Sequence, residues 1–253
     1  MEVLSSQKTF YRTLRITLLM VLISILGWSI TRGFEYTWQW ETLPKWYLVI
    51  KKGLVTTILF SIGTVFFASI LGILLSLLSI SKISIVRELY SIFIELVRNT
   101  PLLVQILIGY FVIGSVFNLS ATVAGIAALS IFTSAYVAEI IRGGIESVEK
   151  GQREAAYTLG LSNFQTTWLI VMPQAIRISL PSLTGQLIST IKDSSLLSVI
   201  AVQELTLSTQ QAISNSAASF EFWTLNAILY FSICFPLSLV VRRLEKKMKA
   251  KVS

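Results

Sequence analysis

The chain contains no histidine and only one cysteine, Cys234, among its 253 residues. The missing histidine excludes Ser-His-Asp and Cys-His catalysis. A lone cysteine cannot form a disulfide within the chain, and a metal site built from histidine and cysteine ligands is not expected. We therefore expect this chain to have neither a catalytic residue nor a metal centre.

Charged residues are also scarce. They make up 13% of the chain, whereas a typical soluble domain contains about 25%. Hydrophobic residues make up 54%, and this imbalance indicates a membrane protein. A Gly-x4-Gly-Lys-Ser/Thr sequence is absent as well, so the chain is not expected to bind ATP in the manner of a P-loop protein.

Six segments are apolar enough to be membrane-crossing helices, each of which needs about 20 mostly apolar residues. They cover residues 16–30, 53–80, 88–117, 121–141, 180–202 and 223–241. The third segment is interrupted near Pro101, and the fifth contains Lys192 and Asp193. The sequence therefore predicts an all-α integral membrane protein with about six transmembrane helices.

The first segment has two interpretations. Lys8, Arg12 and Arg15 precede it, as basic residues precede the apolar run of a secretory signal. No small-x-small cleavage site follows, because the chain continues Gly-Trp-Ser-Ile-Thr-Arg. We favour a retained anchor helix over a cleaved signal.

Aromatic residues are concentrated after this helix, at Trp38, Trp40, Trp46 and Tyr47. Tryptophan and tyrosine are enriched at membrane–water interfaces, which favours an interfacial belt, with stacking on a ligand as the alternative. We divide the chain into an anchor and external aromatic segment (1–52), a transmembrane domain (53–247) and a cytoplasmic tail (248–253).

The positive charges indicate how the chain is oriented in the membrane. The net charge is +8, and the basic residues lie at the ends of apolar segments, not in a stripe that would suit nucleic acid. If both termini are cytoplasmic, fifteen of the 21 lysines and arginines lie inside, whereas residues 203–222 contain none. By the positive-inside rule, we predict a multi-pass protein of the bacterial cytoplasmic membrane with both termini in the cytoplasm and no nucleic-acid partner.

The segment 143–173 is too polar to cross the membrane, and its charge places it in the cytoplasm. Residues 148–159 contain good helix formers, and Gly160 is well placed to end a short helix in a left-handed conformation. Ser162 can cap a following helix, and Pro173 and Pro181 can break or bend the next one. These features suit either a solvated connector or a docking element.

The same segment resembles the "EAA" signature of importer permeases of the ATP-binding cassette (ABC) class. That signature reads Glu-Ala-Ala, three residues, Gly, nine residues, then Ile-x-Leu-Pro. The matching residues here are Glu154, Ala155, Ala156, Gly160, Ile170 and Pro173, with Met172 in place of Leu. The resemblance implies a coupling helix that fits a groove in a cytoplasmic ATPase subunit. The residues that it assigns to this coupling are Arg153, Glu154, Ala155, Ala156, Gly160 and Pro173.

Three further stretches are similar to polar amino-acid permeases of this class. Residues 97–105 resemble an Arg-Gly-Thr-Pro-Leu motif, with Asn99 replacing glycine, and residues 135–144 and 191–196 are typical of the same group. The resemblance covers residues 50–247 and implies a five-helix importer core, so the first helix is an addition. The implied substrate is a polar amino acid of the glutamine, basic or cystine class.

Charged residues inside the predicted spans are candidates for the substrate pathway, because charge in a bilayer usually serves function. Glu95 and Arg98 are three residues apart on one helix face and can form an ion pair, which is either a structural staple or part of a zwitterion site. Lys192 and Asp193 offer complementary charges, although adjacent residues do not share a helix face. The full candidate set is Glu95, Arg98, Thr100, Pro101, Gln105, Lys192, Asp193, Ser194 and Ser195.

The resemblance also implies the partners. ATP and Mg²⁺ would bind a cytoplasmic ABC ATPase dimer, and this chain itself would hold no cofactor and would not be an enzyme. A second permease subunit, identical or similar, would complete the pathway through the lipid. An extracytoplasmic amino-acid-binding protein would deliver the substrate. The alternatives are a stand-alone channel or secondary transporter of small polar solutes, and a membrane-embedded enzyme that uses Glu95 or Asp193.

Overall fold

The computed structural model describes residues 17–22, 24, 25, 27–29 and 36–249, with the side chains of 244–249 outside the description. Contacts divide the chain into two units, Met1–Trp40 and Glu41–Ser253. In the first, the described residues between 17 and 29 are helical and exposed. The other residues of the predicted anchor, its preceding basic residues and the last residues of the predicted tail lie outside the described part. The domain boundaries predicted at 52 and 247 stay predictions.

The predicted aromatic belt is described in part. Trp38 and Trp40 are exposed, and their rings stack with centroids 5.6 Å apart. The 3-10 helix η1 (Trp40–Trp46) leads into α2 (Tyr47–Ser79). Trp46 is half-buried and packs against the cluster around Ile50, whereas Tyr47 is exposed. Three of the four rings, those of Trp38, Trp40 and Tyr47, are therefore exposed, and the interfacial belt stays a prediction.

The helices α2 and α5 (Ala121–Glu146) form the main packing pair of the second unit. At Gly72 a Cβ atom would lie 2.5 Å from the side chain of Val137, so only glycine permits this approach. Small residues at such close contacts are typical of helix pairs in membranes. The buried positions of α2 are mostly small or hydroxyl-bearing: Ile50, Gly53, Thr57, Ser61, Thr64, Ala68, Gly72 and Ser76.

The third predicted span is broken, as the interruption near Pro101 predicts. It consists of α3 (Ser84–Arg98), α4 (Leu102–Ile108) and the π-helical segment η2 (Gly109–Gly114). Pro101 adopts an extended conformation at the start of α4 and has no N–H to continue the helix of α3. The axis therefore turns by 103° between Arg98 and Leu102. We call residues 97–105 the α3–α4 corner.

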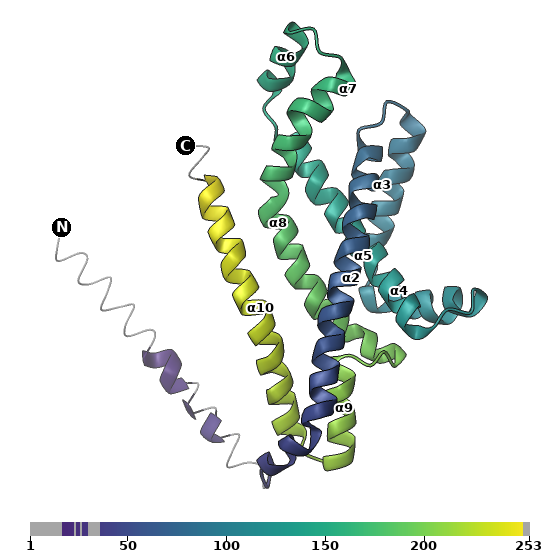
Figure 1. The fold of residues 1–253 in the computed structure, drawn as a ribbon. Helices are drawn as coiled ribbons and strands as arrows, with labels where there is room; N and C mark the ends of the chain where they lie inside the picture. The colour runs from purple at the N-terminus through teal and green to yellow at the C-terminus, as the bar shows by residue number, and fades with distance from the viewer. Residues whose placement is uncertain (1–16, 23, 26, 30–35, 250–253) are drawn as a thin grey trace, which may run out of the picture. The chain divides into compact units, whose positions relative to one another are not determined.

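The rest of the chain forms two ends and the helices that join them (Figure 1). One end carries α6 (Lys150–Thr158), α7 (Asn163–Gln165) and the π-helical segment η3 (Thr166–Val171). From it α8 (Met172–Asp193) runs to the 3-10 helix η4 (Ser194–Ile200). The opposite end carries α9 (Leu205–Ser216), and α10 (Ser219–Lys249) returns along the bundle.

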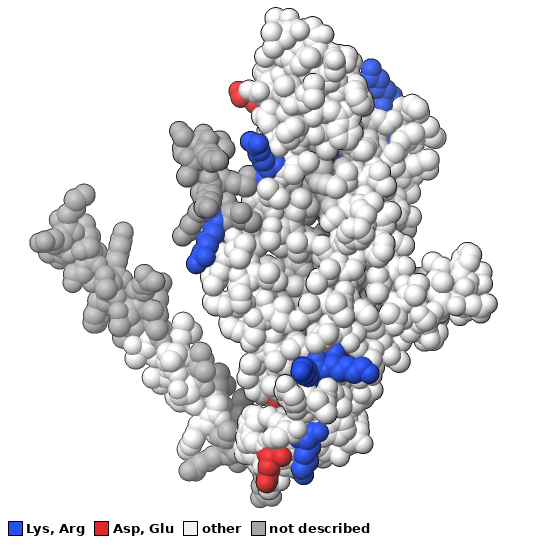
Figure 2. Space-filling model, in the orientation of Figure 1, with Lys and Arg blue, Asp and Glu red and all other residues white. Residues whose placement is uncertain are grey.

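Fewer helices meet the length and hydropathy expected of a span than the six predicted. Among the described residues, three do so: Trp40–Ser79, Ala121–Glu146 and Ser219–Arg243; the bent α3–α4 pair makes a fourth. These match the predicted second, fourth, sixth and third segments. The predicted fifth segment differs, because α8 begins at Met172 and ends at Asp193 and contains Arg177 and many serine, threonine and glutamine residues. Figure 2 shows uncharged atoms over the middle of the face that it displays.

Candidate functional site

The polar loop forms a short helix that ends as the sequence predicts. The helix α6 ends at Thr158, and Gly160, just beyond the C-cap Leu159, has a φ of 77° in the left-handed region. The Gly160 N–H donates to the carbonyl of Tyr157 at 3.0 Å, and the Leu161 N–H donates to that of Ala156 at 3.1 Å. This pair of bonds is the Schellman motif, which glycine favours because it has no Cβ.

The next turn begins with the predicted cap at Ser162. Its hydroxyl accepts a hydrogen bond from the Gln165 N–H, and the Gln165 side chain accepts one from the Ser162 N–H. This reciprocal capping box fixes the direction in which the chain leaves the loop. At the other side of the loop, the Arg153 guanidinium donates to the carbonyl of Ile145 at 3.1 Å and ties α6 to the end of α5.

The loop presents apolar side chains outward. Tyr157, Leu159 and Phe164 are exposed, and Leu159 retains 81% of its accessible surface. Ala156 is buried, whereas Glu154, Ala155 and Pro173 are exposed. We call Tyr157, Leu159 and Phe164 the α6–α7 surface. Exposed apolar groups gathered on a locally fixed turn mark a surface that another molecule can cover.

The predicted ion pair of Glu95 with Arg98 is wrong. Arg98 donates from Nη1 to Glu139 Oε2 on α5 at 2.9 Å, while the Glu95 carboxylate accepts a long hydrogen bond from the Ser91 hydroxyl at 3.5 Å. The helix face of α3 that carries Arg98 meets α5, so the tertiary partner replaces the local one. Glu139 also pairs locally with Arg142 at 2.7 Å, as expected for residues one turn apart.

The other residues of the α3–α4 corner are held by one side chain. The amide of Gln105 lies within hydrogen-bonding distance of the carbonyls of Val97 and Thr100 and of the Thr100 hydroxyl, at 2.7, 3.1 and 2.7 Å. The helix break leaves these carbonyls without a helical donor, and Gln105 supplies one. Arg98, Thr100, Pro101 and Gln105 are thus brought together, and Glu95 stays apart.

Lys192 and Ser195 line a cavity of about 370 Å³ together with Thr206, Trp223, Asn226 and Tyr230. Among the described residues, no ion pair involves Lys192 or Asp193. The hydroxyls of Ser194 and Ser195 donate to the carbonyls of Ile191 and Lys192, both at 2.7 Å, and so complete the end of α8. The cavity therefore combines an unpaired cation with hydroxyl, amide and aromatic groups.

A carboxylate that sequence reasoning did not single out supports one wall of this cavity. Glu204 is fully buried and caps α9, accepting from the N–H groups of Thr206 and Leu207 at 2.8 and 2.7 Å. The Tyr230 hydroxyl donates to the same carboxylate at 3.0 Å. Burial raises the pKa of the Glu204 carboxyl, against the opposing effect of these hydrogen bonds. The only sequence signal was an acidic residue just before a polar helix.

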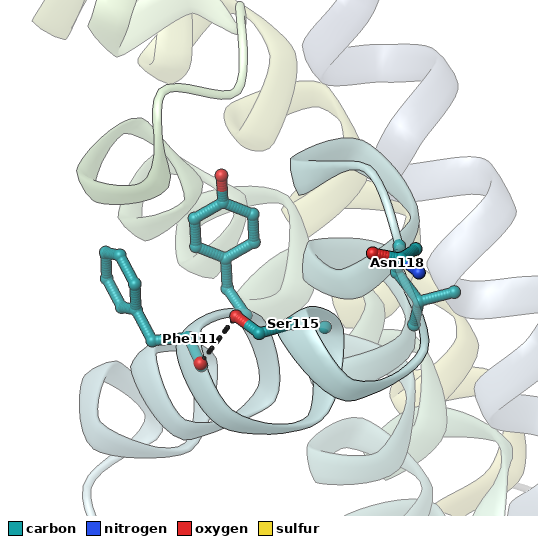
Figure 3. Close-up of a pocket in the computed structure, with 6 residues that line it drawn as sticks. Phe111, Ser115 and Asn118 are labelled. Carbon is teal, nitrogen blue, oxygen red and sulfur yellow. Dashed lines mark hydrogen bonds between the residues drawn. The ribbon is translucent and has the colours of Figure 1, made fainter.

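A second cavity, of about 320 Å³, lies beside η2 and the turn that follows it. Figure 3 shows that the Ser115 hydroxyl points back to the helix, where it donates to the carbonyl of Phe111 at 2.8 Å. The other lining residues include Asn118 and no charged residue. This cavity suits a charged amino acid less well than the cavity beside Lys192.

Comparison with known proteins identifies the family. Residues 65–250 match the family described as binding-protein-dependent transport system inner membrane component. A probable glutamine ABC transporter permease of Bacillus subtilis is 39% identical over 198 residues, which cover 76% of this chain and 90% of the relative. An L-cystine transport system permease of the same species is 35% identical, covering 89% and 97%. The glutamine transport system permease of Escherichia coli is 34% identical, covering 85% and 98%.

Solved structures agree with this assignment. The crystal structure of an amino acid ABC transporter with histidines is similar to this chain with a TM-score of 0.78 and 33% identity, covering 84% of this chain and all of the other. An inward-facing methionine ABC transporter is similar in fold, with a TM-score of 0.63 and 17% identity over 78% of this chain and 97% of the other. The chain therefore belongs to the binding-protein-dependent transport system inner membrane components, as the multi-pass permease subunit, separate from the ATPase, of a polar amino-acid ABC importer.

Proposed function

We propose that this permease moves a polar amino acid of the glutamine, basic or cystine class inward, driven by an ATPase dimer that docks on the α6–α7 surface. The observation that carries the proposal is the exposure of Tyr157, Leu159 and Phe164 on a turn whose backbone is fixed by its own caps. The named relatives transport glutamine and cystine, which supports this substrate class.

The proposed topology has six helices: the five-helix importer core and a retained first helix. The helix α8 serves as the fifth span, because its 22 residues extend about 33 Å at 1.5 Å per residue, enough for a hydrocarbon core of about 30 Å. Both termini and α6 lie in the cytoplasm, and α9 lies outside. The distribution of lysine and arginine supports this orientation.

The proposed substrate contact is the cavity beside Lys192. The Lys192 ammonium attracts the substrate carboxylate, whereas Asp193 does not line this cavity. By the proposed topology, the cavity is at the outer end of α8, where a binding protein would release its cargo. Arg98, Thr100, Pro101 and Gln105 shape the α3–α4 corner instead, and Ser194 completes the end of α8.

The proposed cycle is a two-state switch. ATP closes the two ATPase subunits, and α6 of this chain and of a second permease subunit move with them. The spans then change from an inward-open to an outward-open arrangement, and hydrolysis resets them. Substrate biases this equilibrium only through a difference in its affinity for the two states.

The test uses the assembled complex with its ATPase and binding protein in proteoliposomes. ATP hydrolysis and uptake are measured for a panel of polar amino acids, with the permease alone as the control. We expect one member of the panel to stimulate both activities. Uptake by the permease alone without ATP would contradict the proposal and would favour a channel or secondary transporter.

A further inference from the structure

Glu139 is the centre of an ionic cluster that joins α3 to α5. Its Oε1 accepts from the Tyr90 hydroxyl at 2.9 Å and from Arg142 Nε at 2.7 Å. Its Oε2 accepts from Arg98 Nη1 at 2.9 Å and from Arg142 Nη2 at 3.1 Å. A carboxylate has about four acceptor sites, so these contacts occupy its full capacity. Glu139 is thus committed to protein groups and has no site left for a substrate ammonium.

The cluster continues toward the α6–α7 surface. Arg142 also donates from Nη1 to Glu146 Oε1 at 2.6 Å, on the last residue of α5. One residue earlier, the Ile145 carbonyl accepts the hydrogen bond from Arg153 of α6. Side chains and one helix end therefore connect Glu139 to α6 without a gap.

In the other direction the cluster reaches the α3–α4 corner. Arg98 is the last residue of α3, and its guanidinium also lies 5.5 Å from the Tyr136 ring centroid, over the ring. The corner beyond it is held by the three contacts of the Gln105 amide. A displacement of Arg98 therefore displaces a braced corner, not a loose chain.

The cluster is partly shielded from solvent, which strengthens it. The side chain of Glu139 is 19% exposed, against 42% for Arg98. Charge-assisted bonds to a carboxylate, and a two-pronged arginine pair above all, are stronger than neutral hydrogen bonds. Removal of one partner leaves the others under-satisfied in a partly dry environment.

We propose that Glu139 is a positioning residue for transport, which transmits motion of α6 to the α3–α4 corner by holding Arg98 on one side and Arg142 on the other. This inference rests on the proposed docking of an ATPase at the α6–α7 surface. It assigns Glu139 a role in coupling and no contact with the substrate.

The test is the number of amino-acid molecules taken up per ATP hydrolysed, measured in the complete complex in proteoliposomes. Glu139→Gln keeps the size of the side chain and removes its charge. We expect its uptake per ATP to fall by about tenfold, within the usual range of coupling between distant sites. Glu88→Gln makes the same change at an exposed position of α3 and should keep the wild-type ratio.

A purely structural role would lower uptake and hydrolysis in proportion to the amount of assembled complex and would leave their ratio unchanged. Arg98→Gln should reproduce the loss, and the double variant with Glu139→Gln should lose no more than either alone. If Glu139→Gln does not assemble, Arg142→Lys carries the test, because it keeps the charge and cannot reproduce the two parallel bonds that Arg142 makes to Glu139.

Three outcomes are distinguishable. A lowered ratio in Glu139→Gln or Arg142→Lys supports the inference. A wild-type ratio in every variant that assembles overturns it. Failure of the wild-type complex to couple hydrolysis to uptake overturns the proposed function itself.

Discussion

The two ends of the bundle are built in opposite ways. At the end with α6 and α7, caps and turns satisfy the backbone locally, and Tyr157, Leu159 and Phe164 point outward. At the end with α9, the apolar side chains of Leu205 and Ala212 are buried in a core cluster. There the outward positions are amides and hydroxyls: Gln210, Gln211, Ser214 and Asn215. One end is complete in water, whereas the other exposes groups that need a partner.

The largest expected effect is loss of ATPase binding when the α6–α7 surface is changed. Leu159→Glu places a charge where the ATPase is proposed to bind, and loss of a central apolar contact of this kind typically weakens an interface by about 30-fold or more. Copurification of the ATPase with the permease over a range of ATPase concentrations measures the affinity of the two proteins. Asn215→Glu on α9 is the matched control, and equal weakening by both variants would contradict the contrast between the two ends.

A second change acts on the shape of the same loop. Gly160→Val forces a β-branched residue into a left-handed conformation, which costs about 1–3 kcal/mol locally. No neighbouring atom lies within 4 Å of an added Cβ, so the strain comes from the backbone alone. We expect the variant permease to reach the membrane in normal amounts but to take up less amino acid per ATP hydrolysed. Uptake and hydrolysis are measured with purified complexes. Gly63→Val is the matched control, because an added Cβ there also has no close neighbour and Gly63 has no positive φ. This control should leave coupling intact. Wild-type coupling in Gly160→Val would refute the role of the turn.

The cavity beside Lys192 allows a smaller test near the opposite end. Lys192→Gln removes the unpaired cation, and we expect the substrate concentration for half-maximal uptake to rise by about tenfold, as for loss of one charged hydrogen bond. Lys51→Gln changes an exposed lysine of α2 outside the cavity and should have little effect. Unchanged concentration dependence in Lys192→Gln would remove this cavity from the pathway.

The smallest expected effect concerns Glu204 and pH. Burial raises the pKa of this carboxyl in the folded state, so the fold binds its proton more tightly than the unfolded chain does. Its contribution to stability is present below the unfolded pKa of about 4.3 and is lost as pH rises through the folded value. The free energy of unfolding of the wild type, relative to that of Glu204→Gln, should therefore fall as pH rises across that window. A pH-independent difference between the two would contradict this.

The sequence predicted best what depends on neighbouring residues. The left-handed turn at Gly160, the cap at Ser162 and the break at Pro101 follow from local chemistry, and the structure contains all three. The number of spans was harder to predict from the sequence, because α8 is a continuous helix whose composition mixes apolar with polar residues. Residue spacing alone could not show that two sequence-distant segments form one cavity.

Tertiary partners were the main failure of sequence reasoning. Arg98 was paired with Glu95 because three residues separate them, whereas packing of α3 on α5 brings Glu139 closer. The spacing of Glu139 and Arg142 indicates a local pair one turn apart, whereas the contacts of Glu139 with Arg98 and Tyr90 cross 41 and 49 residues. Glu204 was missed because glutamate is an uncommon cap, so a buried helix start at that position had no clear signal.

The most direct test of the account is site-specific photocrosslinking in native membranes, with the crosslinker placed at position 159 or at position 215. The account predicts that position 159 forms an adduct with an ATPase subunit that carries a P-loop and that position 215 does not. An ATPase adduct from position 215, or none from position 159 in a complex active in uptake, would contradict it.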